Sequence, residues 1–310
     1  MKRDIRSIQD LSAAEIREVF ALAIDLKAKV KRREPHPLLA GRVLAMIFEK
    51  PSLRTRVTFE TGMVQLGGHA IYLQPSDIGL GKRESVYDVA TCLSRWVDLV
   101  MARTFAQKTV DDLAAFGTVP VINGLSDLEH PCQVLADCLT LRERWGELAG
   151  RRIAWVGDGN NVCHSLILLC ARLGVHLTVG SPEGYEPKGV ILEATQRDAV
   201  ETGSQIRIVR DPVEAVKGAD AVFTDTWASM GQENEAEARK AIFEPYQLNR
   251  TLLAKANPGA LVLHCLPAHR GEEITDEVID GPQSVVYDEA ENRLHAQKAL
   301  MVCLVRWSGM

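Results

Sequence analysis

The sequence predicts an α/β fold of two domains, each built on a doubly wound parallel sheet, with helices joining them. The chain has 310 residues, which corresponds to about two domains at a prior of ~150 residues per domain. Short apolar runs of strand length alternate with helical patterns in both halves, as is typical of parallel sheets covered by helices. Apolar residues make up 46% and charged residues 25% of the chain, which is ordinary for a globular protein.

The first half alternates strands and helices from residue 42 onward. Residues 42–48 (RVLAMIF) form an apolar run of strand length, and the helical pattern after it stops at Gly67 and Gly68. The same periodicity rules give further strands and helices, namely strands at 69–73, 99–103 and 119–123 and helices at 53–66, 85–96 and 110–116.

The second half repeats this alternation. Residues 152–156 (RIAWV) predict a strand, and the helical pattern after it ends at Gly174. The other expected elements are strands at 175–179, 205–209, 221–224 and 260–264 and helices at 162–173, 212–217, 274–279 and 292–307. The amphipathic segment 130–145 lies between the two halves and is expected to connect them.

Composition excludes several classes of protein. The formal net charge is −5, and without a basic patch such a chain is a poor candidate for binding nucleic acid. No apolar run approaches the ~18–20 residues of a membrane span, and no apolar segment of a signal peptide follows the first residues. Seven scattered cysteines without a Cys-x-x-Cys pair favour reduced thiols in the cytoplasm over disulfides or a metal site.

Ligands of open parallel sheets collect at the carboxyl ends of the strands, so the segment after residues 42–48 is a candidate site. Ser52 is a plausible N-cap of the helix that follows. Arg54 and Arg56 are unfavourable at the positive end of a helix unless an anion binds there, and a phosphate would satisfy N–H groups, hydroxyls and a guanidinium together. An equally good interpretation is a capped helix whose arginines pair with Glu49 or Glu60.

Three other segments carry polar groups that suit a ligand or a simple structural role. His130 precedes a helix whose dipole favours neutral imidazole, which can donate to a carbonyl oxygen, and Gln133 lies nearby; a capping histidine is the alternative. Asp225 suits a cationic amine or an Asx-turn. His264 is badly placed to act as a base for Cys265, because adjacent strand residues point to opposite faces, and a buried inert thiol is the usual role of cysteine.

The segment 157–161 (GDGNN) resembles the start of a dinucleotide fingerprint. Val162 stands where the third glycine is needed, and Glu183 only loosely provides the acidic residue after the next strand. Asn160 and Asn161 can instead bind the carboxylate of a zwitterion or form a turn. An NAD-dependent oxidoreductase therefore remains an alternative with little support.

Four segments together, in this order, resemble the transcarbamoylase family: residues 48–56 (FEKPSLRTR), 130–133 (HPCQ), 225–231 (DTWASMG) and 264–267 (HCLP). The last two are similar to the ornithine branch rather than the aspartate branch. The resemblance implies a carbamoyl-phosphate domain at residues 1–138, completed by the C-terminal helix 292–310, and an ornithine domain at 139–291. It also implies a homotrimer or a multiple of trimers with sites shared between neighbours.

The resemblance implies a set of ligand residues. For carbamoyl phosphate these are Ser52, Leu53, Arg54, Thr55, Arg103, His130, Gln133, Cys265, Leu266 and Arg293. For ornithine they are Asn161, Asp225, Ser229 and Met230. The catalytic roles would fall to Arg103, His130, Asp225 and Cys265. Leu53 stands where the family usually has threonine, so a hydroxyl is lost there and the backbone N–H remains. The loop 76–85, expected to reach a neighbour's site, lacks the glutamine that family members often carry, and no ligand is assigned in it.

The implied activity is transfer of the carbamoyl group of carbamoyl phosphate to the δ-amino group of L-ornithine, giving L-citrulline and phosphate in arginine metabolism. This chemistry needs no metal and no organic cofactor. Within the family, N-acylated ornithine, putrescine or aspartate stay open as alternative acceptors. A non-catalytic amino-acid-binding protein on the same scaffold is a further alternative.

Overall fold

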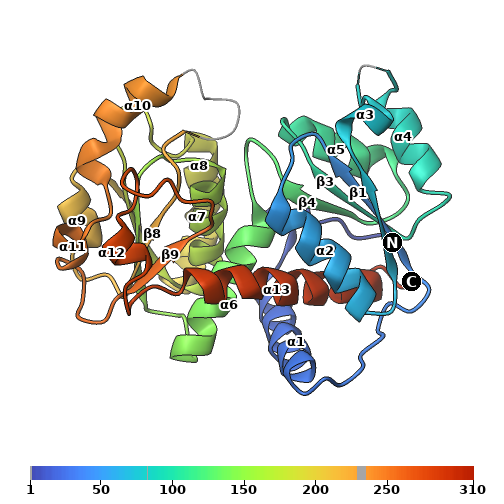
Figure 1. Ribbon diagram of the computed structural model, residues 1–310, viewed down its shortest axis with the longest axis horizontal. Helices are drawn as coiled ribbons and strands as arrows, with labels where there is room; N and C mark the ends of the chain where they lie inside the picture. Colours follow the sequence, from blue (N-terminus) through green and yellow to red (C-terminus); the bar gives the residue numbers. More distant parts are fainter. Residues whose placement is uncertain (1, 82, 229–234) are drawn as a thin grey trace. The chain divides into compact units, whose positions relative to one another are not determined.

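The computed structural model describes residues 2–81, 83–228 and 235–310. The chain forms two compact units, and unit 1 comprises Met1–Leu139 and Glu291–Met310, while unit 2 comprises Thr140–Ala290. Each unit holds one all-parallel sheet with helices against it (Figure 1), which confirms the predicted fold class. No helix within the described ranges is both long enough and apolar enough to cross a membrane.

Unit 1 is built on a four-stranded sheet of order β2-β1-β3-β4. Its strands are β1 (Val43–Phe48), β2 (His69–Leu73), β3 (Leu99–Arg103) and β4 (Val121–Leu125). In the central pairing, Phe48 lies opposite Arg103. The last residues of β1 and β3 therefore meet at one edge of the sheet, beside the segment that leads into the next helix.

Helices cover both faces of this sheet. They are α1 (Ala13–Lys31), α2 (Leu53–Gln65), α3 (Pro75–Ile78), α4 (Val86–Leu93), α5 (Gln107–Phe116), the first part of α6 (Pro131–Trp145) and most of α13 (Val286–Trp307). Alternate strand residues such as Ala45 and Val100 pack against Val89 of α4 and Leu113 of α5. The strand residues between them are also buried, so the sheet is covered on both faces as parallel sheets require.

Unit 2 has a five-stranded sheet of order β7-β6-β5-β8-β9. The strands are β5 (Arg152–Val156), β6 (His176–Gly180), β7 (Ile206–Val209), β8 (Ala221–Thr224) and β9 (Leu261–His264), and the helices are α7 (Asn161–Leu173), α8 (Gly189–Thr202), α9 (Pro212–Val216), α10 (Ala236–Phe243), α11 (Arg250–Leu253) and α12 (Asp276–Ile279). The strand order reverses between β5 and β8. The loops after these two strands therefore flank the position where open α/β sheets bind ligands.

Some elements differ from the sequence prediction. Helices α1, α3, α8, α10 and α11 were missed. Ser12 and Glu15 form a capping box at the start of α1 that is a readable helix signal. The strand expected at 119–123 begins only at Val121, because Pro120 has no N–H for a ladder hydrogen bond. The last helix begins at Val286 instead of residue 292, since the residues between contain no glycine or proline and place two carboxylates in the first turn.

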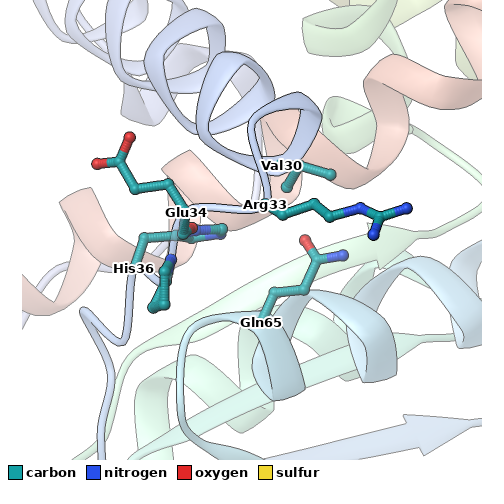
Figure 2. A pocket seen from close by; sticks show the side chains of 6 residues that line it. Val30, Arg33, Glu34, His36 and Gln65 are labelled. Atoms are coloured by element: carbon teal, nitrogen blue, oxygen red, sulfur yellow. The ribbon is translucent and has the colours of Figure 1, made fainter.

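A small cavity of about 280 Å³ lies in unit 1, beside the C-terminal end of α1 (Figure 2). It is lined by Val30, Arg33, Glu34, Pro35, His36 and Gln65. Figure 2 shows the Gln65 amide pointing toward Arg33, while the Glu34 carboxylate points away. None of the side chains that the sequence singles out as ligands lines this cavity.

Candidate functional site

The start of α2 is organised around a hydroxyl cap. Ser52 Oγ accepts a hydrogen bond from the Thr55 N–H at 3.3 Å and lies 3.1 Å from Thr55 Oγ1, which confirms Ser52 as the N-cap. Arg56 pairs with Glu60, with Nε 3.0 Å from a carboxylate oxygen, and its guanidinium lies 3.9 Å from the centre of the Tyr72 ring. The ion-pair interpretation of Arg56 is therefore correct.

A buried network joins this helix start to two other helices. Arg293 of α13 is only 2% exposed, and it donates to Thr55 Oγ1 at 3.2 Å, to Gln133 Oε1 at 2.5 Å and to Gln297 Oε1 at 2.9 Å. Gln133 in turn donates to Asp137 at 2.8 Å. The network brings together four predicted ligand residues, since Ser52 contacts Thr55.

His130 is buried just before α6. Burial, followed by the positive charges of Arg293, Arg103 and Arg54, lowers its pKa well below 6.5. The sequence prediction of a neutral imidazole agrees with this direction, although the causes are desolvation and three guanidiniums instead of the helix dipole. Arg54, Arg103 and Arg293 are thus all close enough to act on the same imidazole, and this concentration of positive charge favours an anion nearby.

Arg103 and Leu53 complete this group in unit 1. Arg103 is the buried last residue of β3, and its carbonyl oxygen accepts from the Glu49 N–H at 2.8 Å. The Leu53 side chain is 74% exposed, so it contributes its N–H in the first turn of α2 and little core packing. The predicted carbamoyl-phosphate ligands that belong to unit 1 are called the unit 1 cluster. They are Ser52, Leu53, Arg54, Thr55, Arg103, His130, Gln133 and Arg293.

Asp225 is the centre of a second cluster, in unit 2. The buried carboxylate accepts from Asn160 Nδ2 at 2.8 Å, from the Thr226 N–H at 2.8 Å and from the Cys265 thiol at 2.9 Å. Asn160 also caps α7 by accepting from the N–H groups of residues 162 and 163. The carboxylate thus contacts the next backbone N–H, an amide and a thiol together, at the carboxyl ends of β5, β8 and β9.

Both ring nitrogens of His264 contact groups other than the Cys265 thiol. The alternation of strand side chains does not separate the two residues, because β9 ends at His264 and one ring nitrogen lies within 4.8 Å of Cys265 Sγ. His264 Nδ1 accepts from the Leu266 N–H at 2.9 Å, and its Nε2 lies 3.0 Å from Glu273 Oε1. His264 therefore orders the chain after β9 instead of acting as a base for Cys265. Cys265 and Leu266 belong to unit 2, so these two predicted carbamoyl-phosphate ligands are not in the same unit as the unit 1 cluster.

Gly159, the second glycine after β5, allows another segment of backbone to approach closely. A Cβ on Gly159 would lie 2.2 Å from the Pro187 nitrogen, so only glycine fits against that backbone. Asn161 is the first residue of α7. The glycine that resembled a dinucleotide fingerprint is thus explained by the chain's own contact.

Two residues of unit 2 were missed by the sequence analysis. Asp158 is buried after β5, and burial raises its pKa to about 6 although the nearby Arg239 opposes the shift. Arg239 donates to Asp158 at 3.0 Å and to the Trp227 carbonyl at 2.8 Å. The position of Asp158 after a strand was a usable signal, whereas nothing local marks Arg239. The predicted ornithine ligands Ser229 and Met230 lie outside the described residues.

Within the described ranges, two groups of side chains have donor atoms close enough for a metal ion. In the first, Asp225, His264 and Cys265 lie together, but both ring nitrogens of His264 already have the partners given above. The second group is His269, Glu272 and Glu273, in the loop after β9.

Comparisons with known proteins agree over nearly the whole chain. The family model described as aspartate/ornithine carbamoyltransferase, carbamoyl-P binding domain, matches residues 3–143, and the model of the Asp/Orn binding domain matches residues 149–304. An ornithine carbamoyltransferase of Methanocorpusculum labreanum is 54% identical over 305 residues, covering 98% of this chain and 99% of that protein.

Solved structures give the same result. The ornithine carbamoyltransferase from Pyrococcus furiosus matches with a TM-score of 0.94 and 52% identity, covering 96% of each chain. An acetylornithine transcarbamylase complexed with acetylcitrulline matches with a TM-score of 0.88 and 30% identity, covering 98% of this chain and 99% of that one. The chain belongs to the aspartate/ornithine carbamoyltransferase family.

Proposed function

We propose that the protein transfers the carbamoyl group of carbamoyl phosphate to the δ-amino group of L-ornithine, producing L-citrulline and phosphate. The observation that carries the proposal is the buried network in which Arg293 joins Thr55 and Gln133 beside a neutral His130. The identity of more than half to a named ornithine carbamoyltransferase over 305 residues supports the choice of acceptor.

The unit 1 cluster is suited to bind phosphate, the leaving group of this reaction. The first N–H groups of α2 have no intrahelical acceptors, and the helix dipole favours an anion there. Arg54 and the Ser52 and Thr55 hydroxyls add charge and hydrogen bonds at the same end. In this proposal they bind the phosphate and stabilise it as the bond to the carbamoyl carbon breaks.

His130 and Arg103 suit the carbamoyl oxygen. Attack on the carbamoyl carbon places negative charge on this oxygen, and a fixed donor aimed at such a charge typically contributes ~3–4 kcal/mol to catalysis. A neutral imidazole provides one N–H donor, and the Arg103 guanidinium adds positive charge. Gln133, held by Arg293 and Asp137, has an amide suited to the carbamoyl NH₂ group.

Asp225 and Cys265 suit the acceptor amine. A free δ-amino group has a pKa near the lysine reference of about 10.4, and it must lose a proton before it attacks. A carboxylate paired with a thiol can orient the amine and accept the proton that the amine loses. We assign Asn161, Ser229 and Met230 to the remaining contacts with ornithine on family resemblance alone.

The proposal is tested by a matched pair of variants measured for citrulline formation. Arg54→Gln should lower kcat/KM for carbamoyl phosphate by about 10²–10³-fold, because a charged donor to the transition state is lost. Arg56→Gln, two positions further along the same helix, removes a guanidinium that is already paired with Glu60 and should change kcat/KM little. Equal effects of the two substitutions would refute the assigned roles, and absence of citrulline from the unaltered protein would refute the activity.

The acceptor is tested separately, because an acetylornithine transcarbamylase shares the fold. We expect turnover of L-ornithine to exceed that of N-acetylornithine, putrescine and aspartate at equal concentrations. A preference for any of the other three would retain carbamoyl transfer and change the substrate.

We also propose a homotrimer or a multiple of trimers. Large apolar side chains of unit 1, including Leu53, Val64 and Trp96, are exposed, but the choice of a trimer rests on the family resemblance. The solution mass from light scattering should be three times the 34.2 kDa chain mass or a multiple of it. The seven cysteines, all within the described residues, form no disulfide, which supports a reducing compartment such as the cytoplasm.

A further inference from the structure

Three side chains gather in the loop after β9, and the proposed reaction uses none of them. One ring nitrogen of His269 and one carboxylate oxygen each of Glu272 and Glu273 lie within 4.8 Å of one another. The loop that carries them is held closed by a hydrogen bond from the Gly271 N–H to the Ile274 carbonyl at 2.9 Å. Imidazole nitrogens and carboxylate oxygens are both ligands of zinc in proteins.

Glu273 distinguishes this cluster from ordinary surface carboxylates. Its side chain is 0% exposed. Its Oε1 accepts from the His269 N–H at 2.6 Å and from His264 Nε2 at 3.0 Å, and Nε2 must carry the proton because Nδ1 accepts from the Leu266 N–H.

The other oxygen of Glu273 has no such partner. Oε2 makes no hydrogen bond to any residue in the described ranges, and it lies 3.8 Å from His269 Nδ1. A buried carboxylate oxygen without a partner is costly. A cation bound between Oε2 and the His269 ring would remove this cost.

The other two side chains give an ion access from solvent. The side chains of His269 and Glu272 are 52% and 39% exposed, so water can complete the coordination. Lys240 lies 3.3 Å from Glu272 Oε1, but exposed pairs of this kind contribute little, and the flexible lysine can be displaced by a divalent ion.

We infer that His269, Glu272 and Glu273 form a binding site for a divalent transition-metal ion such as Zn²⁺. Glu273 Oε1 holds His264, and His264 Nδ1 holds the Leu266 N–H. An ion on Oε2 therefore stabilises the segment that carries Cys265 without contacting it. The site lies within unit 2, and its existence does not depend on the proposed reaction.

Cobalt(II) is the probe, because its visible absorption reports coordination geometry. The full chain, freed of metal by chelator and dialysis, is titrated with Co²⁺. We expect saturation at one equivalent per chain, without a near-ultraviolet thiolate-to-metal band. His269→Gln and Glu272→Gln should each weaken binding by at least ~10-fold, by analogy with the losses seen when groups around a metal are removed.

Lys240→Gln is the matched control, because it removes the competing cation and leaves all three ligands. It should bind Co²⁺ as tightly as the unaltered protein or more tightly, and circular dichroism verifies that each variant is folded. Absence of saturable binding, or binding unchanged in both ligand variants, would overturn the inference. A thiolate band abolished by Cys265→Ser would also overturn it, since the ion would then lie at the other cluster. Citrulline formation is measured separately, so either proposal can fail alone.

Discussion

At the scale of single residues, His130 owes its neutral state to its surroundings. Burial and the charges of three arginines lower its pKa well below 6.5, whereas in the unfolded chain its pKa returns to about 6.5. Between these two values the unfolded state binds a proton that the folded state does not. The free energy of unfolding therefore falls as the pH drops through this window.

This linkage gives the first prediction. Urea unfolding at pH 7.5 and pH 5.5 should show a stability loss of up to ~1.4 kcal/mol per pH unit from His130. His130→Asn should show a smaller loss, though not zero, because burial also lowers the pKa of His295 to about 3. Identical pH dependence in the two proteins would contradict the buried, neutral histidine.

A second prediction at this scale concerns Leu53. Leu53→Thr restores the hydroxyl that the family usually has, at a side chain that is 74% exposed. Stability should change by no more than ~0.5 kcal/mol, as for most exposed positions, while KM for carbamoyl phosphate should fall or stay equal. Steady-state kinetics and thermal unfolding measure the two effects, and an increase in KM would show that the threonine hydroxyl does not serve the phosphate here.

Residue roles were predictable from sequence only where they are local. Ser52 caps α2 by accepting a hydrogen bond from Thr55, three residues further along, and this local pattern can be read from the sequence. The contact between Arg293 and Gln133 joins positions 160 residues apart, so the role of Arg293 came from family resemblance. Arg239 was missed because its partners, Asp158 and Trp227, lie in other loops.

At the scale of elements, α13 connects the unit 1 cluster to the rest of unit 1. Arg293 makes hydrogen bonds with Thr55 of α2, Gln133 of α6 and Gln297 of its own helix. Lys298, one turn further along, donates to Gln65 at 2.7 Å and contacts His36 Nε2 at 2.9 Å. The C-terminal helix therefore fixes the position of α2, whose start is the proposed phosphate site.

A third prediction follows from this arrangement. Arg293→Lys cannot keep all three contacts, because lysine lacks the planar fork of donors. We expect a loss of ~3–5 kcal/mol in stability, the usual cost of breaking a buried polar network, together with a higher KM for carbamoyl phosphate. Arg306→Lys, at an exposed position of the same helix, should alter neither by a measurable amount in urea unfolding and kinetics. Equal stability of the two variants would contradict the role of α13.

Strands were easier to predict than helices in this chain. Most strands of the two parallel sheets are buried and appear as apolar runs, although the outer strands β2 and β7 are only partly buried. Each strand in the described part of the chain was found, with ends shifted by two residues or fewer. Helix α8 has a mixed pattern and an uncapped start at Lys188, which explains why it was missed. The short helix α11 depends on Asn249 as its cap and is too short to show a period.

At the scale of the whole molecule, the two units divide the proposed chemistry. Unit 1 contains the helix start that we propose binds the phosphate, the three arginines and His130, and unit 2 contains Asp225 with Cys265. The sequence predicted two α/β halves because strand and helix patterns alternate twice. Which side chains of each half meet could not be predicted without the family, since the contacts depend on the order of strands in each sheet.

The central claim is that carbamoyl phosphate binds where the first turn of α2 meets Arg54, Arg103 and His130. The most direct measurement is a crystal structure of the full protein soaked with a phosphonate analogue of carbamoyl phosphate. We predict the phosphonate oxygens within hydrogen-bond distance of the Ser52–Thr55 backbone N–H groups and the Arg54 guanidinium. An analogue bound elsewhere, with the start of α2 empty, would contradict the account.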